Sequence, residues 1–540
     1  MTVGIVSEPG KDTNEFMFLT PDDEKLKTGE FVYYNALVKV ESKSGGLKTE
    51  EKKIYSRITD REECRGYPDE FMADPEVDPK KIAKKLGLSS EDMERYRITA
   101  KIIGFYDDRI NDFTNPRIVP KPGTPIELAP DDDLERFLTN VEEDVASANI
   151  GDLLHRPPDQ VNVKVPVDNF TATHLSILAS TGSGKSYTCA VIAEELMKPD
   201  SRAALLILDP HGEYHTLKDI ETLDEFQGED GYSPEVQILK PDKVKIRISE
   251  LSFSDLLSSL DSPTSAQEPI LREAWNRLSG EKYVTPEMLF QTCYEIGVTT
   301  GNEASAEALE WRIKKAFNRE LFDPSQNLAL DDLLNPGQCS IIQLDTVSRR
   351  DQQMLVNVLF RKIYRERVNH EKGRKSKLDF PVFAILEEGH RFAPASGDAR
   401  SLPILRTILS EGRKFGFGIG VISQRPSKID DDVLSQCKTQ MIMQIQNPND
   451  QDAIKRAVER VGEDLLDEVA GLTSGQAVVA GDSVNTPFLC RIRNRITDHG
   501  AESLKTSKRW RNSWKQNSTG AKKVVDADDE EGAEDREEFL

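Results

Sequence analysis

A fifteen-residue stretch at positions 174–188, HLSILASTGSGKSYT, constrains this chain more than any other feature. Its apolar run 175–179 is typical of a buried strand, a turn of small residues follows, and a helical pattern comes next. A strand that ends in a glycine-rich turn and feeds a helix directs several backbone N–H groups and the helix N-terminus at one point. We therefore predict a phosphate-binding loop whose nucleotide-contacting residues are Thr181, Gly182, Ser183, Gly184, Lys185, Ser186 and Tyr187.

Two side chains of this loop carry its chemistry. Lys185 is expected to reach the β- and γ-phosphates, and the hydroxyl of Ser186 is expected to bind Mg²⁺. The strict pattern has glycine five residues before Gly184, where this chain has Ala179. A Gly-Lys-Ser/Thr tripeptide alone is weak evidence, because chance places one in about one chain in four of this length. The flanking strand and helix favour phosphate binding over a plain Gly/Ser loop.

The composition narrows the class of protein. The chain has 540 residues, of which 37% are hydrophobic and 31% charged, as in globular proteins of more than one domain. It has no apolar run of about 18 residues to span a membrane, and its first residues lack the features of a signal peptide. Its six cysteines are far apart without a CxxC pair, which argues against disulfides and zinc. We expect a cytoplasmic protein without membrane contact.

The charge limits how this chain could bind nucleic acid. Its net charge is −23, which disfavours general coating of DNA or RNA. Part of that charge lies in residues 521–540, which carry nine acidic side chains against three basic ones. Any contact with DNA is therefore expected on a local basic surface, such as the inside of a ring.

The first part of the chain predicts a small β-barrel over residues 1–130. Short strands are expected at 16–19, 31–40, 53–58 and 98–105, with a helical insert at 79–97. Residues 120–133 are rich in proline and aspartate and indicate a linker, and we place the domain boundary at 131–150.

Residues 151–500 predict an α/β domain with a mainly parallel sheet. Strands alternate with helices, and the strand candidates are 175–179, 203–208, 340–344, 382–386, 418–422 and 440–444. Residues 216–330 have no comparable strand series and predict a helical insertion lying on the sheet, with one helix at 304–318. An amphipathic helix is expected at 351–368. In the tail, 501–540, the acidic part from about 519 is expected to be disordered.

A pair of acids follows one of the expected strands. Glu387 and Glu388 come directly after the apolar run 382–386. A P-loop enzyme needs an acid at a neighbouring strand end to orient hydrated Mg²⁺, and a hydrolase also needs a carboxylate that polarises the attacking water. The pair can supply both roles. The alternative, two exposed charges at a strand end, is less economical beside a phosphate-binding loop.

The sequence LLILDPHGEY at 205–214 places Asp209 at another strand end, where ligands collect in such sheets. Asp209, His211 and Glu213 could be taken for a metal trio. We favour hydrogen bonding around the active site, with Asp209 near the nucleotide, because DP and HG are also common in turns.

Two further side chains are candidates for the hydrolytic step. Gln424 follows the strand at 418–422 and could contact the γ-phosphate or the attacking water, although a strand-ending turn explains it equally well. Arg413, in EGRKFG, could act within its own subunit or reach a neighbour's phosphate as an arginine finger. We expect His174 to be a local hydrogen-bonding residue.

These motifs occur in a recognisable order: HLSILASTGSGKS, LDPHGEY, ILEEGH, EGRKFGFG and SQRPSKIDDDVLSQCKTQ. Together they resemble the HerA family, in the HerA/FtsK branch of P-loop ATPases, over about residues 150–500. The resemblance implies a RecA-like core, ATP and Mg²⁺ as cofactors, and a homohexameric helicase or translocase with DNA in its central channel.

The resemblance also implies roles for individual residues. Glu387 takes the position of the Walker B acid, which contacts Mg²⁺ through water, and Glu388 that of the catalytic base. Gln424 becomes the sensor, and Arg413 the finger that acts across the subunit interface. Thr173 stands where relatives often have a basic residue, so a second arginine acting in trans is not expected.

Family members work with an effector that docks on the N-terminal barrel. The resemblance implies a NurA-like nuclease in DNA end processing and repair, or a sirtuin-like NADase or another nuclease in antiviral defence. A different hypothesis is an ATP-responsive ring scaffold that gates an effector, with DNA movement secondary or absent. A small-molecule kinase would leave the paired glutamates and the SQRP segment unexplained. Arg349, Arg350 and Lys428 are pore candidates by position only.

Overall fold

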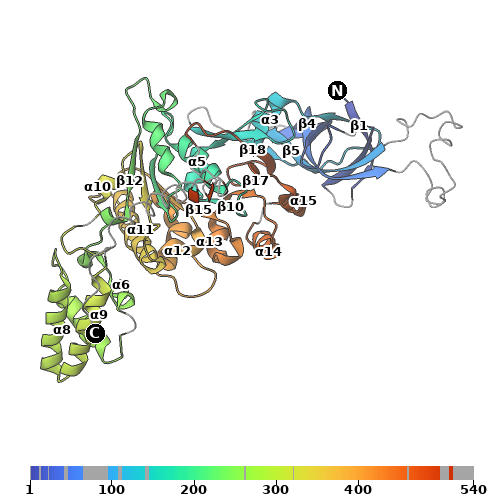
Figure 1. Ribbon diagram of the computed structural model, residues 1–540. Coiled ribbons are helices and arrows are strands. Elements are labelled where there is room, and N and C mark those ends of the chain that lie inside the picture. The colour runs from blue at the N-terminus through green and yellow to red at the C-terminus, as the bar shows by residue number, and fades with distance from the viewer. Residues whose placement is uncertain are drawn as a thin grey trace, which may run out of the picture. The chain divides into compact units, whose positions relative to one another are not determined.

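The computed structural model (Figure 1) describes residues 2–498 with gaps, and five residues between 507 and 514. The gaps are 11–13, 22–23, 42–46, 65–94, 108–111, 140–144, 261–262, 320, 327 and 459–460. Residues 1–498 form one compact unit, and residues beyond 498 belong to a second. The expected acidic tail from 519 and most of the expected insert at 79–97 lie outside the described residues.

The N-terminal part is a closed antiparallel barrel, as predicted. Its strands pair in the order β2-β1-β7-β3-β4-β5, and a β2–β5 pairing closes the circle, while β6 (Asp112–Thr114) pairs with β5 alone. Alternate side chains point inward, so Phe16 and Phe18 of β2 are fully buried. The strands are β1 (Thr2–Pro9), β2 (Glu15–Thr20), β3 (Phe31–Glu41), β4 (Leu47–Cys64), β5 (Arg95–Asp107) and β7 (Pro125–Leu128).

The segment 120–133 differs from our expectation of a linker. It contains β7, which pairs with β1 on one side and β3 on the other and so completes the barrel. Helix α3 (Asp131–Leu138) then begins directly after Pro130. A four-residue strand flanked by prolines has a turn-like composition, so its sequence does not distinguish it from a connecting segment.

The second sheet has eleven strands in the order β12-β13-β11-β14-β15-β10-β16-β17-β18-β8-β9. The neighbours from β12 to β16 are parallel, and those from β16 to β9 are antiparallel. The six predicted strands are confirmed to within two residues. They are β10 (Leu175–Leu178), β11 (Ala204–Asp209), β13 (Gln338–Gln343), β14 (Val382–Leu386), β15 (Phe417–Ser423) and β16 (Thr439–Met443).

Five strands of this sheet were not predicted. One of them, β12, lies inside the region that we expected to be helical, and the other four extend the sheet beyond β16. Two of those four, β8 and β9, precede the phosphate-binding loop in the chain. The unpredicted strands are β8 (Ser147–Leu153), β9 (Asn162–Pro166), β12 (Glu235–Leu239), β17 (Gln476–Gly481) and β18 (Phe488–Ile492).

Helices cover both faces of the parallel part of the sheet (Figure 1). Alternate residues of β14 join different hydrophobic clusters: Ala384 packs with the cluster of α11 and α12, whereas Phe383 and Ile385 pack with that of α5. The expected helix at 351–368 is confirmed as α11. The helices of this domain outside the insertion are α4 (Val167–Ala172), α5 (Lys185–Leu196), α10 (Leu330–Leu333), α11 (Arg349–Glu371), α12 (Leu402–Glu411), α13 (Asp431–Gln436), α14 (Pro448–Ala457) and α15 (Glu463–Glu468).

The helical insertion is shorter than predicted and differently placed. It follows β12 and consists of α6 (Phe253–Ser259), α7 (Gln267–Arg277), α8 (Pro286–Thr300) and α9 (Glu303–Phe317). We expected these helices to lie on the sheet, but Figure 1 shows α8 and α9 projecting beyond α6, away from it. Their apolar sides face each other, because Gly297 of α8 sits against Ala306 of α9.

Buried ion pairs join the barrel to the second sheet, among them Arg57–Asp464 and Arg156–Glu30. Arg57 of β4 is 5% exposed and donates hydrogen bonds to Asp464 of α15 (2.7 Å) and to the carbonyl of Pro487 (2.9 Å).

In the described part of the chain, no helix has the length and apolar character needed to cross a bilayer.

Candidate functional site

The phosphate-binding loop connects β10 to α5 and is held from the neighbouring strand. Ser180 N donates to the carbonyl of Gln444 (2.8 Å), and the Ser183 hydroxyl donates to the same carbonyl (3.1 Å). Gly182 and Gly184 have φ angles of 83° and 100°, a region that only glycine occupies without strain. Ala179, at the position of the missing glycine, is buried and has no such φ angle, so its methyl group is tolerated.

The lysine of the loop faces the acid pair, which follows β14. Lys185 is 7% exposed, its ammonium group contacts a carboxylate oxygen of Glu387, and it lies 3.7 Å from Glu388. The other oxygen of Glu387 accepts a hydrogen bond from the hydroxyl of Tyr214 (3.0 Å). The Ser186 hydroxyl lies 3.4 Å from Glu387. These oxygen atoms are of the kind that Mg²⁺ prefers, so the donor set fits that ion.

The second acid is held by the predicted sensor. Gln424 follows β15, which lies between β10 and β14 in the sheet, and its amide nitrogen donates to Glu388. Its amide oxygen accepts from the hydroxyl of Thr181 in the phosphate-binding loop (2.5 Å). The other Glu388 oxygen is buried and accepts no hydrogen bond from the described residues, although His390 Nδ1 lies 3.2 Å away.

The surroundings keep Glu388 ionised. Burial alone would raise its pKa, but the contact with His390, the positive charge of Lys185 and the hydrogen bond from Gln424 outweigh it and lower the pKa to about 2. Glu388 also has a φ angle of 54°, which is strained for a residue with a side chain. Backbone strain and a shifted pKa on one residue are typical of a functional position.

The turn after β11 is organised by Asp209. This carboxylate is fully buried and accepts hydrogen bonds from the backbone N–H groups of His211 (3.1 Å), Gly212 (2.8 Å) and Tyr214 (3.2 Å). We expected Asp209 to contact the nucleotide. Instead, the oxygen atoms of Asp209 are enclosed and already accept hydrogen bonds from these backbone N–H groups, so the residue stabilises the turn. The neighbouring Glu213 reaches the loop and accepts a hydrogen bond from Ser186 (2.5 Å).

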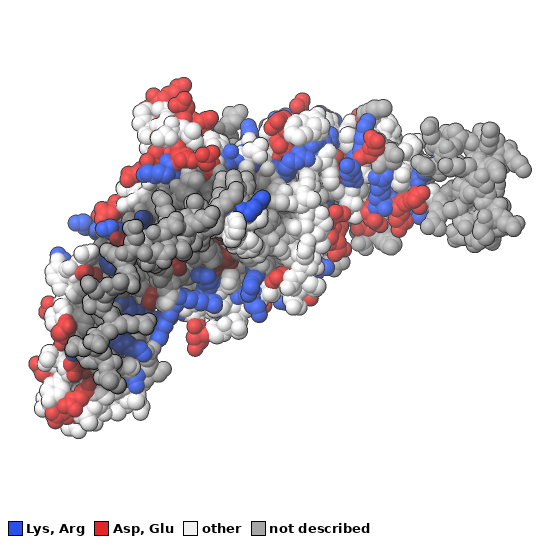
Figure 2. Space-filling view, in the orientation of Figure 1, with Lys and Arg blue, Asp and Glu red and all other residues white. Residues whose placement is uncertain are grey.

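Arg413 does not join the site of its own chain. It lies in the 3-10 helix Gly412–Phe415, is exposed, and its side chain forms no hydrogen bond or ion pair with the described residues. Figure 2 shows Lys and Arg side chains along the surface where α12, α13 and α14 lie in Figure 1. Five exposed cations of this region have no ion-pair partner among the described residues: Arg413, Lys414, Arg425, Lys428 and Arg456.

Two other predicted residues have local partners. His174 is 2% exposed, and its Nδ1 accepts a hydrogen bond from Ile419 N (3.1 Å), as expected of a structural histidine. Burial lowers its pKa to about 4, so its ring is neutral at pH 7. The pore candidate Arg349 donates to the carbonyl of His390 (2.9 Å), two residues after Glu388 in the chain.

Three contacts of the site were not predicted. His390 and Tyr214 are the last residues of the motifs ILEEGH and LDPHGEY, so their closeness to the acid pair could have been inferred from the sequence. The third involves Tyr187, whose hydroxyl accepts a hydrogen bond from the backbone N–H of Arg495 (2.7 Å). The intervening chain is about three hundred residues long, and no local pattern signals the pairing.

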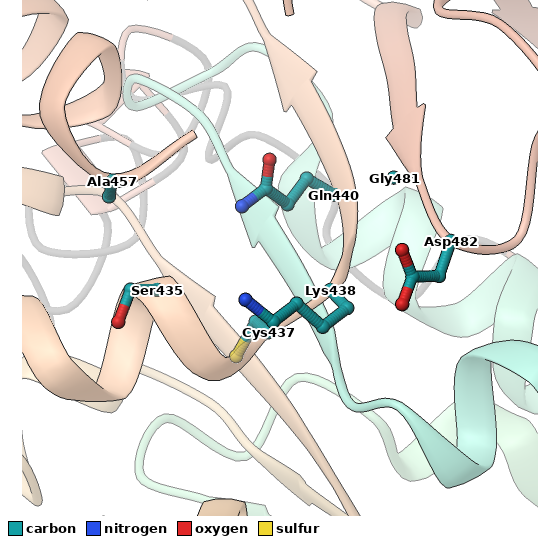
Figure 3. Close-up of a pocket in the computed structure, with 7 residues that line it drawn as sticks. All are labelled: Ser435, Cys437, Lys438, Gln440, Ala457, Gly481 and Asp482. Atoms are coloured by element: carbon teal, nitrogen blue, oxygen red, sulfur yellow. The ribbon is translucent and has the colours of Figure 1, made fainter. Parts of the chain in front are cut away.

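Figure 3 shows a cavity of about 120 Å³ at the opposite end of β16. Lys438 and Gln440 lie at the amino end of this strand, whereas the phosphate-binding loop contacts residues just past its carboxyl end. Gln440 is 6% exposed, and its amide makes no hydrogen bond to a described residue. The cavity is therefore separate from the site around Lys185.

In this sheet β15 separates the strand of the phosphate-binding loop from the strand of the acid pair, and the lysine, both acids and Gln424 meet at one edge. That arrangement defines a RecA-like P-loop ATPase. Residues 148–363 match the family described as "Helicase HerA, central domain". With the similarity described next, the chain belongs to the HerA family.

The relatives span most of the chain. It is 30% identical to the DNA double-strand break repair helicase HerA of Pyrococcus furiosus, over 82% of this chain and 86% of the relative. It is also 30% identical to a probable helicase of Methanocaldococcus jannaschii, over 78% and 81% of the two chains. Among solved structures, VirB4 of Thermoanaerobacter pseudethanolicus has a TM-score of 0.48 and 14% identity, covering 65% of this chain and 97% of that one.

Proposed function

We propose that this chain is the ATP-hydrolysing subunit of a ring-shaped DNA translocase or helicase. The observation that carries the proposal is the contact chain Thr181–Gln424–Glu388, which joins the phosphate-binding loop to an ionised, partly unsatisfied carboxylate. A protein that only binds nucleotide has no need of such a carboxylate. One relative named above is a DNA double-strand break repair helicase and another is a probable helicase, which supports DNA as the substrate.

In the proposed reaction Glu388 is the general base. Its Oε2, which lies 3.2 Å from His390 Nδ1, would accept a proton from the attacking water, while Gln424 fixes the carboxylate and senses the phosphate through Thr181. Lys185 would exchange Glu387 for the β- and γ-phosphates when ATP binds. Ser186 and, through water, Glu387 would hold Mg²⁺, which neutralises phosphate charge when bound.

The proposed assembly is a homohexamer in which Arg413 completes the neighbour's site. An exposed guanidinium without a partner among the described residues of its own chain is suited to a phosphate supplied by another subunit. The other four exposed cations of this region, which have no ion-pair partner in the described part of the chain, would give an acidic chain of net charge −23 a local basic surface for DNA in a central channel. These cations would then contact the phosphate backbone of DNA, and such contacts do not depend on the base sequence.

Steady-state ATPase activity with and without duplex DNA tests this function. We expect DNA to stimulate turnover, and the stimulation to fall steeply as salt rises from about 50 to 200 mM, because phosphate contacts release counterions. Lys185→Ala and Glu388→Gln should abolish turnover and preserve the assembly. Full activity in either variant would exclude the proposed site.

A second candidate is a ring scaffold that gates an effector docked on the barrel, such as a nuclease or an NADase. The exposure of two apolar side chains on the barrel favours this candidate: Ile5 is 54% exposed and Leu37 is 70% exposed. ATP turnover that ignores DNA but responds to a co-purifying protein would support the scaffold. Loss of that protein from Ile5→Glu and Leu37→Glu variants would place the docking surface on the barrel.

A further inference from the structure

We infer that Glu213 is a third acidic member of the metal site, a carboxylate that holds Mg²⁺ through water beside Ser186 and Glu387. The inference rests on the proposed ATP hydrolysis and adds a residue from the DPHGEY turn to it. It also assigns a function to the glutamate in this turn, which otherwise has none in the site.

The contacts of Ser186 carry the inference. Its hydroxyl donates to Glu213 Oε2 at 2.5 Å and lies 3.4 Å from Glu387 Oε1. A serine hydroxyl has one proton, so it can satisfy only one of these carboxylates at a time. Two negative groups therefore converge on the oxygen atom that P-loop enzymes use to bind the metal. A divalent cation bound among the three groups would neutralise both acids.

Glu213 is held in place from both sides in the sequence. On one side, Asp209 fixes the turn through backbone N–H groups, and Gly212 supplies the φ angle of 73° that the turn needs. On the other side, Tyr214 is buried and bonded to Glu387. The turn and the acid pair therefore form one connected unit, which presents Glu213 to Ser186.

Its neighbours in the motif cannot take the same role. The oxygen atoms of Asp209 are enclosed and bonded to the backbone, and His211 lies 3.9 Å from Glu388 rather than beside Ser186. No group of three His, Cys, Asp or Glu side chains in the described ranges is arranged to hold a metal ion by itself. The site therefore needs phosphate oxygens and water to complete it, as Mg²⁺ sites of nucleotide enzymes do.

The test is a Mn²⁺ titration followed by electron paramagnetic resonance, with the full chain saturated by a non-hydrolysable ATP analogue. We expect Glu213→Gln to weaken Mn²⁺ binding by about 10- to 100-fold, the usual effect of removing an outer-shell ligand. Glu213→Asp should retain part of the affinity, because it keeps the charge on a shorter side chain. Glu225→Gln is the matched control, since it removes the same charge from an exposed residue that forms no hydrogen bond or ion pair with the described residues of the site and follows Glu213 in the chain. Unchanged thermal melting without metal would exclude misfolding.

The outcomes separate this inference from the proposed function. If the wild type binds the analogue and Mn²⁺, and Glu213→Gln binds Mn²⁺ as tightly as the wild type, Glu213 is not part of the metal site. An equal loss in Glu213→Gln and Glu225→Gln would reduce the effect to general charge and also overturn the inference. A wild type that binds neither the analogue nor Mn²⁺ would overturn the proposed ATPase site itself.

Discussion

Gln424 donates its amide N–H to Glu388 and so connects the end of β15 to the acid that follows β14. The oxygen of the same amide group accepts a hydrogen bond from the hydroxyl of Thr181. One side chain therefore bridges the phosphate-binding loop and the proposed base, Glu388. Any shift of the loop on binding phosphate would reach Glu388 through this amide.

Replacing Gln424 by alanine should therefore slow hydrolysis more than it weakens binding. We expect kcat to fall about 100-fold, comparable to the loss of one donor to a reacting group, with KM for ATP changed about twofold or less. Steady-state ATPase measurements give both constants. Gln440→Ala is the control, because that amide lies near the opposite end of β16, away from the phosphate-binding loop. A Gln424→Ala enzyme with half of the wild-type kcat would contradict the bridging role.

The lowered pKa of Glu388 predicts how activity depends on pH. Its pKa of about 2 lies below the ordinary value of 4.5, so the folded state favours the carboxylate. The resulting stability is present above pH 4.5 and is lost as the pH falls toward 2. We expect kcat/KM between pH 4.5 and 8 to show no decline from protonation of Glu388.

That expectation is checked by comparing pH profiles of the wild type and Glu388→Asp. Any acid limb in this range should have the same midpoint in both enzymes, although the variant is slower. A midpoint that moves with the substitution would show that this carboxylate titrates there. His390→Ala should raise the pKa of Glu388 toward 4.5, because it removes one of the groups that lower it.

The role proposed for Arg413 predicts complementation between inactive subunits. Arg413→Ala removes the guanidinium offered to a neighbour, and Glu388→Gln removes the base of the subunit's own site. Mixed rings would contain some interfaces with both groups intact, so activity should recover to a fraction of the wild type. Differently tagged subunits verify that mixed rings form.

Two controls make the mixing experiment decisive. Lys414→Ala, an exposed cation next to Arg413, should by itself leave the ATPase rate close to the wild-type value. Arg413→Ala mixed with a second Arg413 variant should stay inactive. Verified mixed rings without recovery at any ratio would place the function of Arg413 within its own subunit.

The sequence predicts the parallel core and the main site residues because their signals are local. Buried parallel strands are continuous apolar runs, and the polar residues that follow them, such as Glu387 and Gln424, must meet at one edge. Strand β12 and the proline-flanked β7 lack such runs, since both are short edge or closing strands. The pairing of Tyr187 with Arg495, and the enclosure of Asp209 by its own turn, depend on tertiary packing.

The link between barrel and ATPase sheet gives a last prediction, on stability. Arg57 is paired with Asp464 where the two side chains are 6% and 14% exposed, and burial lowers the pKa of the arginine. Arg57→Met leaves Asp464 without its partner, which should cost about 3 kcal/mol, the lower end for breaking a buried pair. Lys53→Met, on the same strand but in an exposed pair with Asp133, should cost about 1 kcal/mol or less.

Denaturant midpoints measure both losses of stability. The double variant Arg57→Met/Asp464→Leu should recover part of the stability lost in Arg57→Met, because no unpaired charge remains. Equal losses in the two single variants would show that the buried pair does not hold the barrel to the sheet.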